Sequence, residues 1–170
     1  MTEKTAGAVR KMIEFYSRTS KVKVHDINHF MKVWGFARTI GISENLDGKT
    51  QETLELAAVA HDIACPLCRE KYGNTDGKYQ EQEGGPLTEA FYSDFNLPRE
   101  QLNRICYLVS HHHTYTGVDG MDYQILLEAD FLVNADESAM PKRAIRNFRE
   151  RVFRTESGIR LLTEMYLPER

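Results

Sequence analysis

The sequence predicts an all-α protein folded as a compact helical bundle. Apolar residues recur at intervals of three and four along most of the chain, as they do on the buried face of a helix. No segment rich in Val, Ile and Thr alternates with polar residues between turn residues, as a strand would require. The 170 residues contain no repeat and are enough to bury a real core. We therefore expect a single domain over residues 1–170.

The first three expected helices each carry apolar residues at helical spacing. Met12 and Tyr16 lie one turn apart on the first helix. Met31 and Trp34 lie on one face of the second, and Gly41 is a natural end for it. The third helix is an almost unbroken apolar run that finishes with a histidine and an aspartate. These helices are expected over residues 5–18, 26–40 and 50–64.

Two of the later helices are expected to begin at a proline. Proline is favoured in the first turn of a helix, where its missing N–H costs nothing, so Pro86 and Pro98 are natural starts. The segment 65–85 holds four of the eleven glycines and is expected to be a functional or mobile loop. The later helices are expected over residues 86–97, 98–113, 122–137, 141–153 and 156–167.

Composition excludes several classes of partner. The formal net charge is −3 and the basic residues are scattered, so we expect neither a nucleic-acid polymer nor a membrane as a partner. No apolar stretch approaches the ~20 residues of a membrane span, and the first residues lack the apolar core of a signal peptide. Three cysteines are more typical of a reduced cytosolic protein than of a disulfide scaffold. We therefore expect a cytoplasmic location.

The histidines form three short clusters. His61 and Asp62 end an apolar run, and a buried carboxylate must be paired or bind a metal. The alternative is a helix end, where Asp62 meets an arginine and His61 is an ordinary core histidine. His25 and His29 share a helix face, which can bind a metal or face solvent. His29 is the better placed of the two, because it lies on the apolar helix.

The third cluster is the run His111, His112 and His113. His112 continues the apolar stripe of the preceding helix, whereas His113 is expected to face solvent or the following loop. The alternative is a polar helix terminus, where cations are favoured by the macrodipole.

Asp130 is a second carboxylate inside an apolar run, between Ala129 and Phe131. Glu128 and Asp136 fit an exposed face better. Together the clusters bring imidazoles and carboxylates from three helices. Such a donor set suits a divalent ion, and positions left open on the ion are typical of a catalytic site. The ion could be Mn, Fe, Ni, Co, Zn or Mg.

The order His29, His61-Asp62, Asp130 resembles the H…HD…D signature of the HD-domain metal-dependent phosphohydrolases. "HFMKV", "AAVAHDIA" and "LLEADFLVN" are similar to the family's motif-bearing helices. The resemblance covers residues 22–140 and leaves the helices in 141–167 outside it. It implies an all-α bundle in which His29, His61, Asp62 and Asp130 bind the metal. It also implies hydrolysis of phosphate monoesters or diesters, often of nucleotides.

The resemblance implies further roles at the same site. "HHHTYTG" is similar to a segment that some members use for a second metal or for the substrate phosphate, which we carry over to His111 and His112. Residues 63–110 contain no histidine, whereas two-metal members have one there, although Glu81 or Glu83 could substitute. The catalytic residues expected are Asp62, His111 and His112.

Lys32 stands where the family usually has an arginine. Lysine keeps the positive charge but loses the planar fork that orients an oxyanion. We expect Lys32, with His111 and His112, to bind the substrate phosphate. The general base is left open among Glu81, Glu83 and Asp26.

Cys65 and Cys68 form a C-x-x-C with no clear partner. Cys106 is the other thiol, so a structural zinc site lacks ligands, and no βαβ pattern supports a redox motif. We expect two small residues in a loop; redox sensing or incidental metal capture is the alternative.

The sequence therefore predicts a metal-dependent phosphohydrolase acting on a small phosphorylated substrate, a nucleotide or a related molecule rather than a polymer. One alternative is a regulatory module that keeps the scaffold and binds metal or nucleotide without turnover. Another is a helical interaction protein with a satisfied core. Apolar residues expected on the surface of the last two helices also predict a homodimer.

Overall fold

Helices account for most of the structure, a computed structural model that describes residues 2–168. That range contains helices and turns but no strand, so the predicted all-α fold is confirmed. None of the helices in it combines the length and the apolar composition needed to cross a membrane. The helices are α1 (Glu3–Thr19), α2 (Lys23–Ser43), α3 (Gly48–Ala60), α4 (Cys65–Tyr72), α5 (Gly77–Phe91), α6 (Arg99–Val109), α7 (Met121–Glu137), α8 (Lys142–Val152) and α9 (Glu156–Tyr166).

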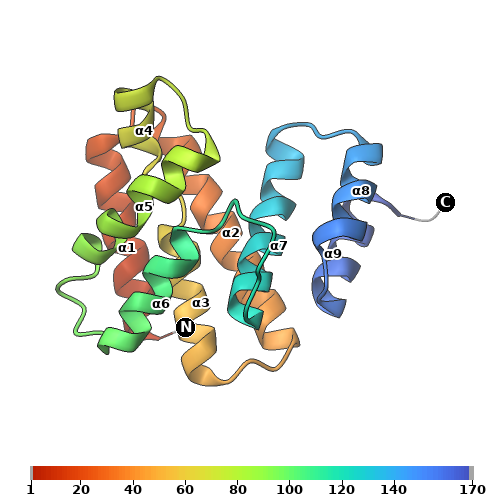
Figure 1. Cartoon of the computed structure of the whole chain (residues 1–170), viewed down its shortest axis with the longest axis horizontal. Helices are drawn as coiled ribbons and strands as arrows, with labels where there is room; N and C mark the ends of the chain where they lie inside the picture. Colours follow the sequence, from red (N-terminus) through yellow and green to blue (C-terminus); the bar gives the residue numbers. More distant parts are fainter. Residues whose placement is uncertain (1, 169–170) are drawn as a thin grey trace.

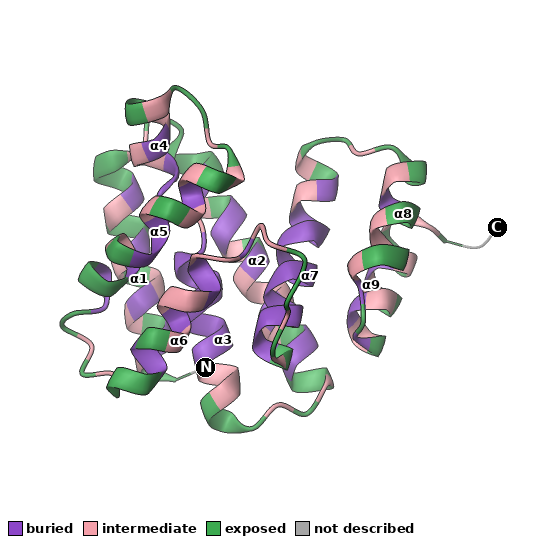
Figure 2. Cartoon of the chain, viewed as in Figure 1, coloured by how far each residue is buried: buried purple, intermediate pink, exposed green. Residues whose placement is uncertain are grey.

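The core lies where α2, α3 and α7 pack together. α2 contacts both α3 and α7, while α1 covers α2 and α3 (Figure 1). α6 packs on α3, α5 packs on α6, and α4 packs on α5. α9 packs on α7, and α8 lies against α9 at the C-terminal end of the structure. Buried residues concentrate on α3 and α7 (Figure 2), so side chains of these two helices are shielded from water.

The segment predicted as a loop over 65–85 is mostly helical, so that prediction is wrong. It forms α4 and the first part of α5, and the connection shrinks to residues 73–76. Gly84 and Gly85 lie inside α5, where α6 comes very close. A Cβ on Gly84 would lie 2.9 Å from Val109 Cγ1, and one on Gly85 would lie 2.5 Å from Ser110 Oγ. The paired glycines therefore mark a close helix contact.

Pro86 does not begin a helix, contrary to the prediction. It lies within α5, which starts at Gly77 and ends at Phe91. Pro98, in contrast, is the N-cap of α6, one residue from its predicted place. A proline inside a helix removes one hydrogen bond of the helix, yet α5 continues through Pro86 and packs on α6.

Two predicted helices end earlier than their apolar pattern indicated. α3 ends at Ala60 rather than residue 64, and the chain continues through tight turns with Ile63 N–H donating to the Ala60 carbonyl at 3.0 Å. α6 ends at Val109 rather than residue 113, followed by a similar turn. Turns of this kind aim side chains differently from an α-helix. Both turns carry histidines.

Glu128 is buried, and the prediction that it fits an exposed face is wrong. Its carboxylate accepts hydrogen bonds from Gln124 Nε2 at 2.7 Å, Arg154 N–H at 2.7 Å and Thr155 N–H at 3.0 Å, and from the Thr155 hydroxyl. Burial raises the pKa of Glu128. These contacts fasten α7 to the connection between α8 and α9. Asp136 is exposed, as expected.

Candidate metal centre

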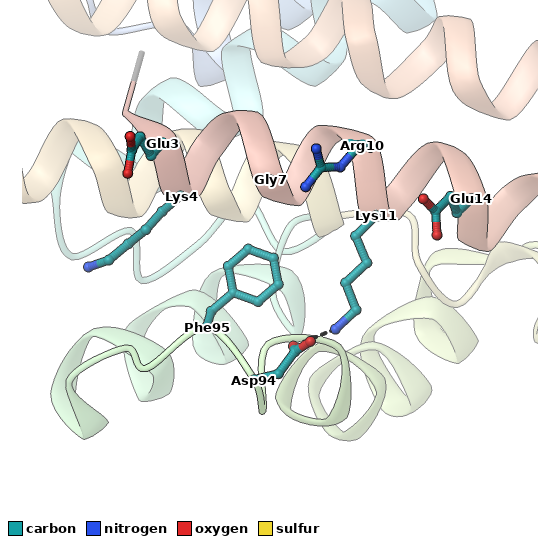
Figure 3. A pocket seen from close by; sticks show the side chains of 8 residues that line it. All are labelled: Glu3, Lys4, Gly7, Arg10, Lys11, Glu14, Asp94 and Phe95. Carbon is teal, nitrogen blue, oxygen red and sulfur yellow. Dashed lines mark hydrogen bonds and ion pairs between the residues drawn. The ribbon is translucent and has the colours of Figure 1, made fainter.

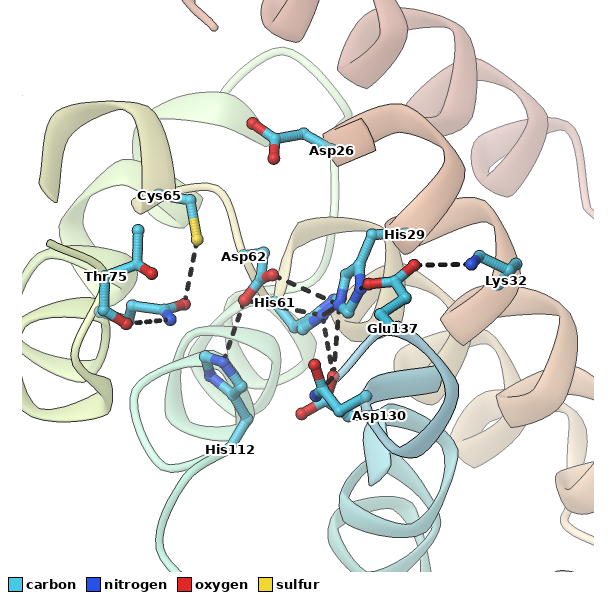
Figure 4. A network of polar contacts seen from close by, with 12 residues as sticks. Asp26, His29, Lys32, His61, Asp62, Cys65, Thr75, His112, Asp130 and Glu137 are labelled. Carbon is cyan, nitrogen blue, oxygen red and sulfur yellow. Dashed lines mark hydrogen bonds and ion pairs between the residues drawn. The ribbon is translucent and has the colours of Figure 1, made fainter. Parts of the chain in front are cut away.

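Side chains from α2, α7 and the turn after α3 converge on one point. His29 Nε2 lies 3.1 Å from His61 Nε2 and 3.3 Å from Asp130 Oδ1. Asp62 completes the group, with Oδ2 at 3.4 Å from His29 Nε2 (Figure 4). These four residues are the metal ligands that the resemblance implied, and the structure brings them together. The tight turn after Ala60 lets the neighbouring His61 and Asp62 face the same point.

The outer nitrogens of both rings are held so that the inner nitrogens are free to bind a cation. His61 Nδ1 lies 2.8 Å from the Ala58 carbonyl oxygen, which can only accept a hydrogen bond. His61 Nδ1 therefore carries the proton, and in the neutral ring Nε2 keeps its lone pair. His29 Nδ1 lies 2.8 Å from Glu137 Oε2, the carboxylate–histidine pairing common in metal sites.

The charges of the cluster are strongly coupled. Burial alone would lower the pKa of His29, but the carboxylates of Asp130, Asp62 and Glu137 outweigh it and raise that pKa to about 10. Burial alone would raise the pKa of Asp130, but His29 and His61 hold it below its usual range. Each carboxylate thus favours positive charge at the centre of the group.

This donor set fits a divalent metal ion. Two Nε2 atoms 3.1 Å apart repel each other unless a proton or a cation lies between them. One ligand atom each from His29, His61 and Asp130 lies within 4.8 Å of the others, and all three residues are buried. Imidazole and carboxylate together suit several divalent ions and exclude none of the predicted ones.

His112 and His113 extend the cluster beyond the predicted ligands. His112 Nδ1 lies 2.7 Å from the Val109 carbonyl, and its Nε2 lies 3.3 Å from Asp62 Oδ1. Both Nε2 atoms are buried; that of His112 has the 3.3 Å contact with Asp62 Oδ1, and that of His113 has no hydrogen-bond partner among residues 2–168. Asp62, His112 and His113 thus form a second group able to hold a cation.

The prediction that His113 faces solvent or a loop is wrong. The ring lies against Gly77, where a Cβ would come within 2.8 Å of its Cγ. Burial, with a further contribution from His112, lowers the pKa of His113 to about 4. The prediction placed His113 by helical spacing, but α6 ends at Val109, before the histidine run, so that spacing does not apply.

The structure does not bring His111 or Lys32 to the cluster. The His111 ring stacks on Tyr107 at 4.1 Å, and its Nδ1 lies 2.7 Å from the Tyr107 carbonyl. Lys32 Nζ donates to Glu137 Oε1 at 2.6 Å. Lys32 is therefore linked to the cluster only indirectly, because Glu137 contacts both Lys32 and His29. Their predicted roles in binding phosphate stay predictions.

Glu137 is a site residue that the sequence reasoning missed. It lies on α7 seven residues after Asp130, which is two helical turns and therefore the same face. That spacing is the signal that could have identified it. In Figure 4 its carboxylate lies between His29 and Lys32.

The carboxylates considered as general base have other partners. Glu81 accepts from His113 N–H at 3.0 Å and from the Thr114 hydroxyl at 2.9 Å, so it fixes the histidine turn. Glu83 accepts from Lys71 and Tyr72 on the surface. Asp26 alone among these three lines the hollow beside the metal centre.

A hollow of about 400 Å³ opens beside the cluster. Arg69 lies on its wall and donates to both carboxylate oxygens of Asp26 at 2.8 Å. Cys65 also lines the hollow, where its thiol donates to Gln80 Oε1 at 3.3 Å. A phosphate ester of modest size fits a space of this volume.

Cys65 and Cys68 lie in α4 rather than in the predicted loop. Both are buried, and burial raises the pKa of each thiol. Redox chemistry requires the thiolate, so this environment disfavours the redox alternative and favours two small packed residues.

A larger hollow of about 560 Å³ lies along α1 and shares no lining residue with the first (Figure 3). Its wall is mostly charged, and Lys11 pairs there with Asp94. It contains no histidine and no predicted site residue. The smaller of these two hollows is the one that adjoins the candidate metal ligands.

The fold and this centre define a helical protein with a cluster of imidazoles and carboxylates that could hold a metal ion. A model of the HD domain family matches residues 26–145. The chain belongs to the HD domain family, which confirms the resemblance drawn from its motifs. Family membership and the His–Asp cluster together support a metal-dependent hydrolase.

A solved structure agrees with the fold. The chain is similar to a predicted HD superfamily hydrolase from an uncultured Thermotogales bacterium, with 21% sequence identity and a TM-score of 0.70. The match covers 95% of this chain and 84% of that protein. No curated protein matches the chain by sequence.

Glu137→Gln is expected to weaken metal binding by about 10–100-fold, because it removes the carboxylate that orients His29. Calorimetric titration with Mn²⁺ or Zn²⁺ measures this, with the exposed neighbour variant Asp136→Asn as control. Wild-type metal affinity in Glu137→Gln would contradict the role given to this carboxylate.

Lys32→Gln separates two roles of the lysine. A lysine that only holds Glu137 alters metal affinity, whereas a phosphate ligand alters KM and leaves metal affinity unchanged. Because Lys32 Nζ contacts Glu137 and not the cluster, we expect the first result. Metal titration and steady-state kinetics of the same variant distinguish the two.

Proposed function

We propose that this protein is a metal-dependent phosphohydrolase that cleaves a phosphate monoester or diester of a small molecule such as a nucleotide. The observation that carries the proposal is the convergence of His29, His61, Asp62 and Asp130 beside an open hollow. A structural metal site is normally closed by protein ligands, whereas a site beside an open hollow leaves room for water and substrate.

A divalent ion bound by these residues lowers the pKa of a bound water and polarises a phosphoryl oxygen. His29 and His61 are prepared for that ion, because their Nδ1 atoms are engaged by Glu137 and by the Ala58 carbonyl. Asp62 contacts both groups of candidate ligands. Its Oδ2 lies 3.4 Å from His29 Nε2 and its Oδ1 lies 3.3 Å from His112 Nε2, so His112 positions the carboxylate.

Arg69 takes the part of phosphate ligand that was expected of Lys32. Its guanidinium lines the hollow and is fixed by the two bonds to Asp26. Arginine has five N–H donors, so donors remain for phosphoryl oxygens. His113 lines the same hollow, and its Nε2, which lacks a partner among residues 2–168, can accept a hydrogen bond from an attacking water.

The test is turnover of a panel of phosphate esters, including nucleoside monophosphates and cyclic nucleotides, with Mn²⁺, Co²⁺, Ni²⁺, Zn²⁺ or Mg²⁺ added. Hydrolysis that needs an added or bound metal and is lost in His61→Ala supports the proposal. Tight binding of the same compounds without any turnover would instead identify a regulatory module. Metal analysis of the purified protein finds which ion it retains.

A further inference from the structure

α8 carries a concentration of positive charge that the mildly acidic chain does not show elsewhere. The chain has a net charge of −3, yet α8 contains five basic residues and one acidic residue. Over residues 2–168, no ion pair joins any of these five to a carboxylate. The description of the basic residues as scattered therefore fails for this helix. An unpaired row of cations favours an anionic ligand.

A further hollow, of about 530 Å³, lies between α8 and the segment after α6. Tyr115 and Phe148 line both this hollow and the one beside the metal centre, so the two spaces adjoin. Asn147 and Arg151 provide polar groups on its wall, and Ala144 and Val152 provide apolar ones. This combination of apolar surface and few polar groups is typical of a small-molecule site.

Packed aromatic rings form the boundary between the two hollows. Phe148 stacks on Phe131 with ring centroids 3.7 Å apart and planes 6° apart, and Phe131 directly follows the metal ligand Asp130. Tyr115 meets Phe148 edge to face at 5.1 Å. Tyr115 remains 45% exposed although it is a large aromatic residue. An exposed aromatic ring held by a stacked neighbour is suited to contact a planar ligand.

Arg151 does not line the hollow beside the candidate metal ligands. It lines the hollow between α8 and the segment after α6, and another of about 460 Å³, each time together with Tyr115. A substrate whose phosphate lies at the metal centre and whose body lies on Tyr115 would extend toward this guanidinium. Arg151 would then contact the terminal group of the substrate, and an anionic group pairs best with a guanidinium.

We propose that Tyr115, Phe148 and Arg151 form a leaving-group subsite, which takes an aromatic ring bearing a second anionic group. The ring lies on Tyr115 and Phe148, and the anionic group pairs with Arg151. The inference rests on the proposed function in one respect, because the phosphate to be cleaved must lie beside His29 and Asp130. It goes beyond that function by assigning the part of the substrate that is released.

The proposed contact of the ligand's aromatic ring with Tyr115 is tested by calorimetric measurement of ligand binding to the metal-loaded protein. Adenosine 5′-monophosphate is expected to bind about tenfold more tightly than ribose 5-phosphate, which lacks the base. Tyr115→Ala should remove most of that advantage and leave ribose 5-phosphate binding unchanged, whereas Tyr115→Phe should retain it. Tyr115 is exposed, so its removal spares the core.

The second anionic group is tested with 4-carboxyphenyl phosphate, whose ring bears a carboxylate opposite the phosphate ester. It should bind about tenfold more tightly than phenyl phosphate, and Arg151→Gln should abolish that difference. Arg146→Gln is the matched control, since Arg146 is an exposed cation of the same helix that lines neither hollow. If the two arginine variants have equal effects, Arg151 acts only through the general positive charge of α8. That result would overturn its assignment as the partner of the second anionic group.

Equal wild-type affinities for ribose 5-phosphate and adenosine 5′-monophosphate would overturn the subsite. So would a Tyr115→Ala variant that weakens both ligands equally. Neither result bears on whether the metal centre hydrolyses esters. Conversely, the expected binding differences without turnover of any ester would leave the subsite standing and defeat the proposed function.

Discussion

Exchanging Asp130 for asparagine is expected to lower metal affinity by at least about a hundredfold and to abolish hydrolysis. Changes to residues that merely orient a ligand cost about 10–100-fold in affinity, so the loss of a ligand should cost no less. The amide of Asp130→Asn could still accept a hydrogen bond, but it would bring no negative charge to the two Nε2 atoms of His29 and His61. The substitution nearly preserves volume, which limits any effect on packing.

Metal content after dialysis and kcat with saturating metal are the measurements for Asp130→Asn. Asp136→Asn is the control, because Asp136 is an exposed aspartate on the same helix. A dialysed Asp130→Asn protein that retains wild-type metal content and turnover would remove Asp130 from the ligand set. Circular dichroism of both variants shows whether the helices persist.

Glu128→Ala is expected to destabilise the fold by at least about 3 kcal/mol. The carboxylate is fully buried and accepts three hydrogen bonds from Arg154 and Thr155. Without it, these donors are left unsatisfied, and each buried unsatisfied donor costs about 1–3 kcal/mol. For a chain of this length, such a loss lowers Tm by roughly 6–12 °C.

Urea unfolding of Glu128→Ala, compared with Asp136→Ala, measures this cost on one helix. The exposed control should change the free energy of unfolding by less than about 0.5 kcal/mol. If both variants unfold at the same urea concentration as the wild type, Glu128 does not fasten α7 to the last helices. Because Glu128 lies on α7 with Asp130, the variant's metal affinity should also be recorded.

The helical class could be predicted from local pattern, and the clustering of His29, His61, Asp62 and Asp130 from buried-charge anomalies together with the family resemblance. Apolar spacing alone indicates a helix, and a carboxylate such as Asp130 inside an apolar run requires a partner. The ends of α3 and α6 could not be predicted in this way. Apolar residues continue past Ala60 and polar histidines follow Val109, although the backbone tightens into turns at both places.

The errors elsewhere arise from partners that are distant in the sequence. Gly84 and Gly85 resemble loop residues until α6 is placed beside them. Glu128 resembles a surface residue until Arg154 and Thr155, 26 and 27 residues later, are folded against it. Local sequence patterns depend only on residues close together in the chain, so they do not predict tertiary contacts of this kind.

The wide separation of the ligands along the chain has a consequence for biosynthesis. Glu137 lies 108 residues after His29, the ring that it orients. At about 5–20 residues per second, a ribosome needs roughly 5–20 s to add that length. His29 and Asp62 are made well before Asp130 and Glu137, so the nascent chain lacks the complete set of candidate ligands. If this group binds a metal ion, we therefore expect binding only after α7 has been made.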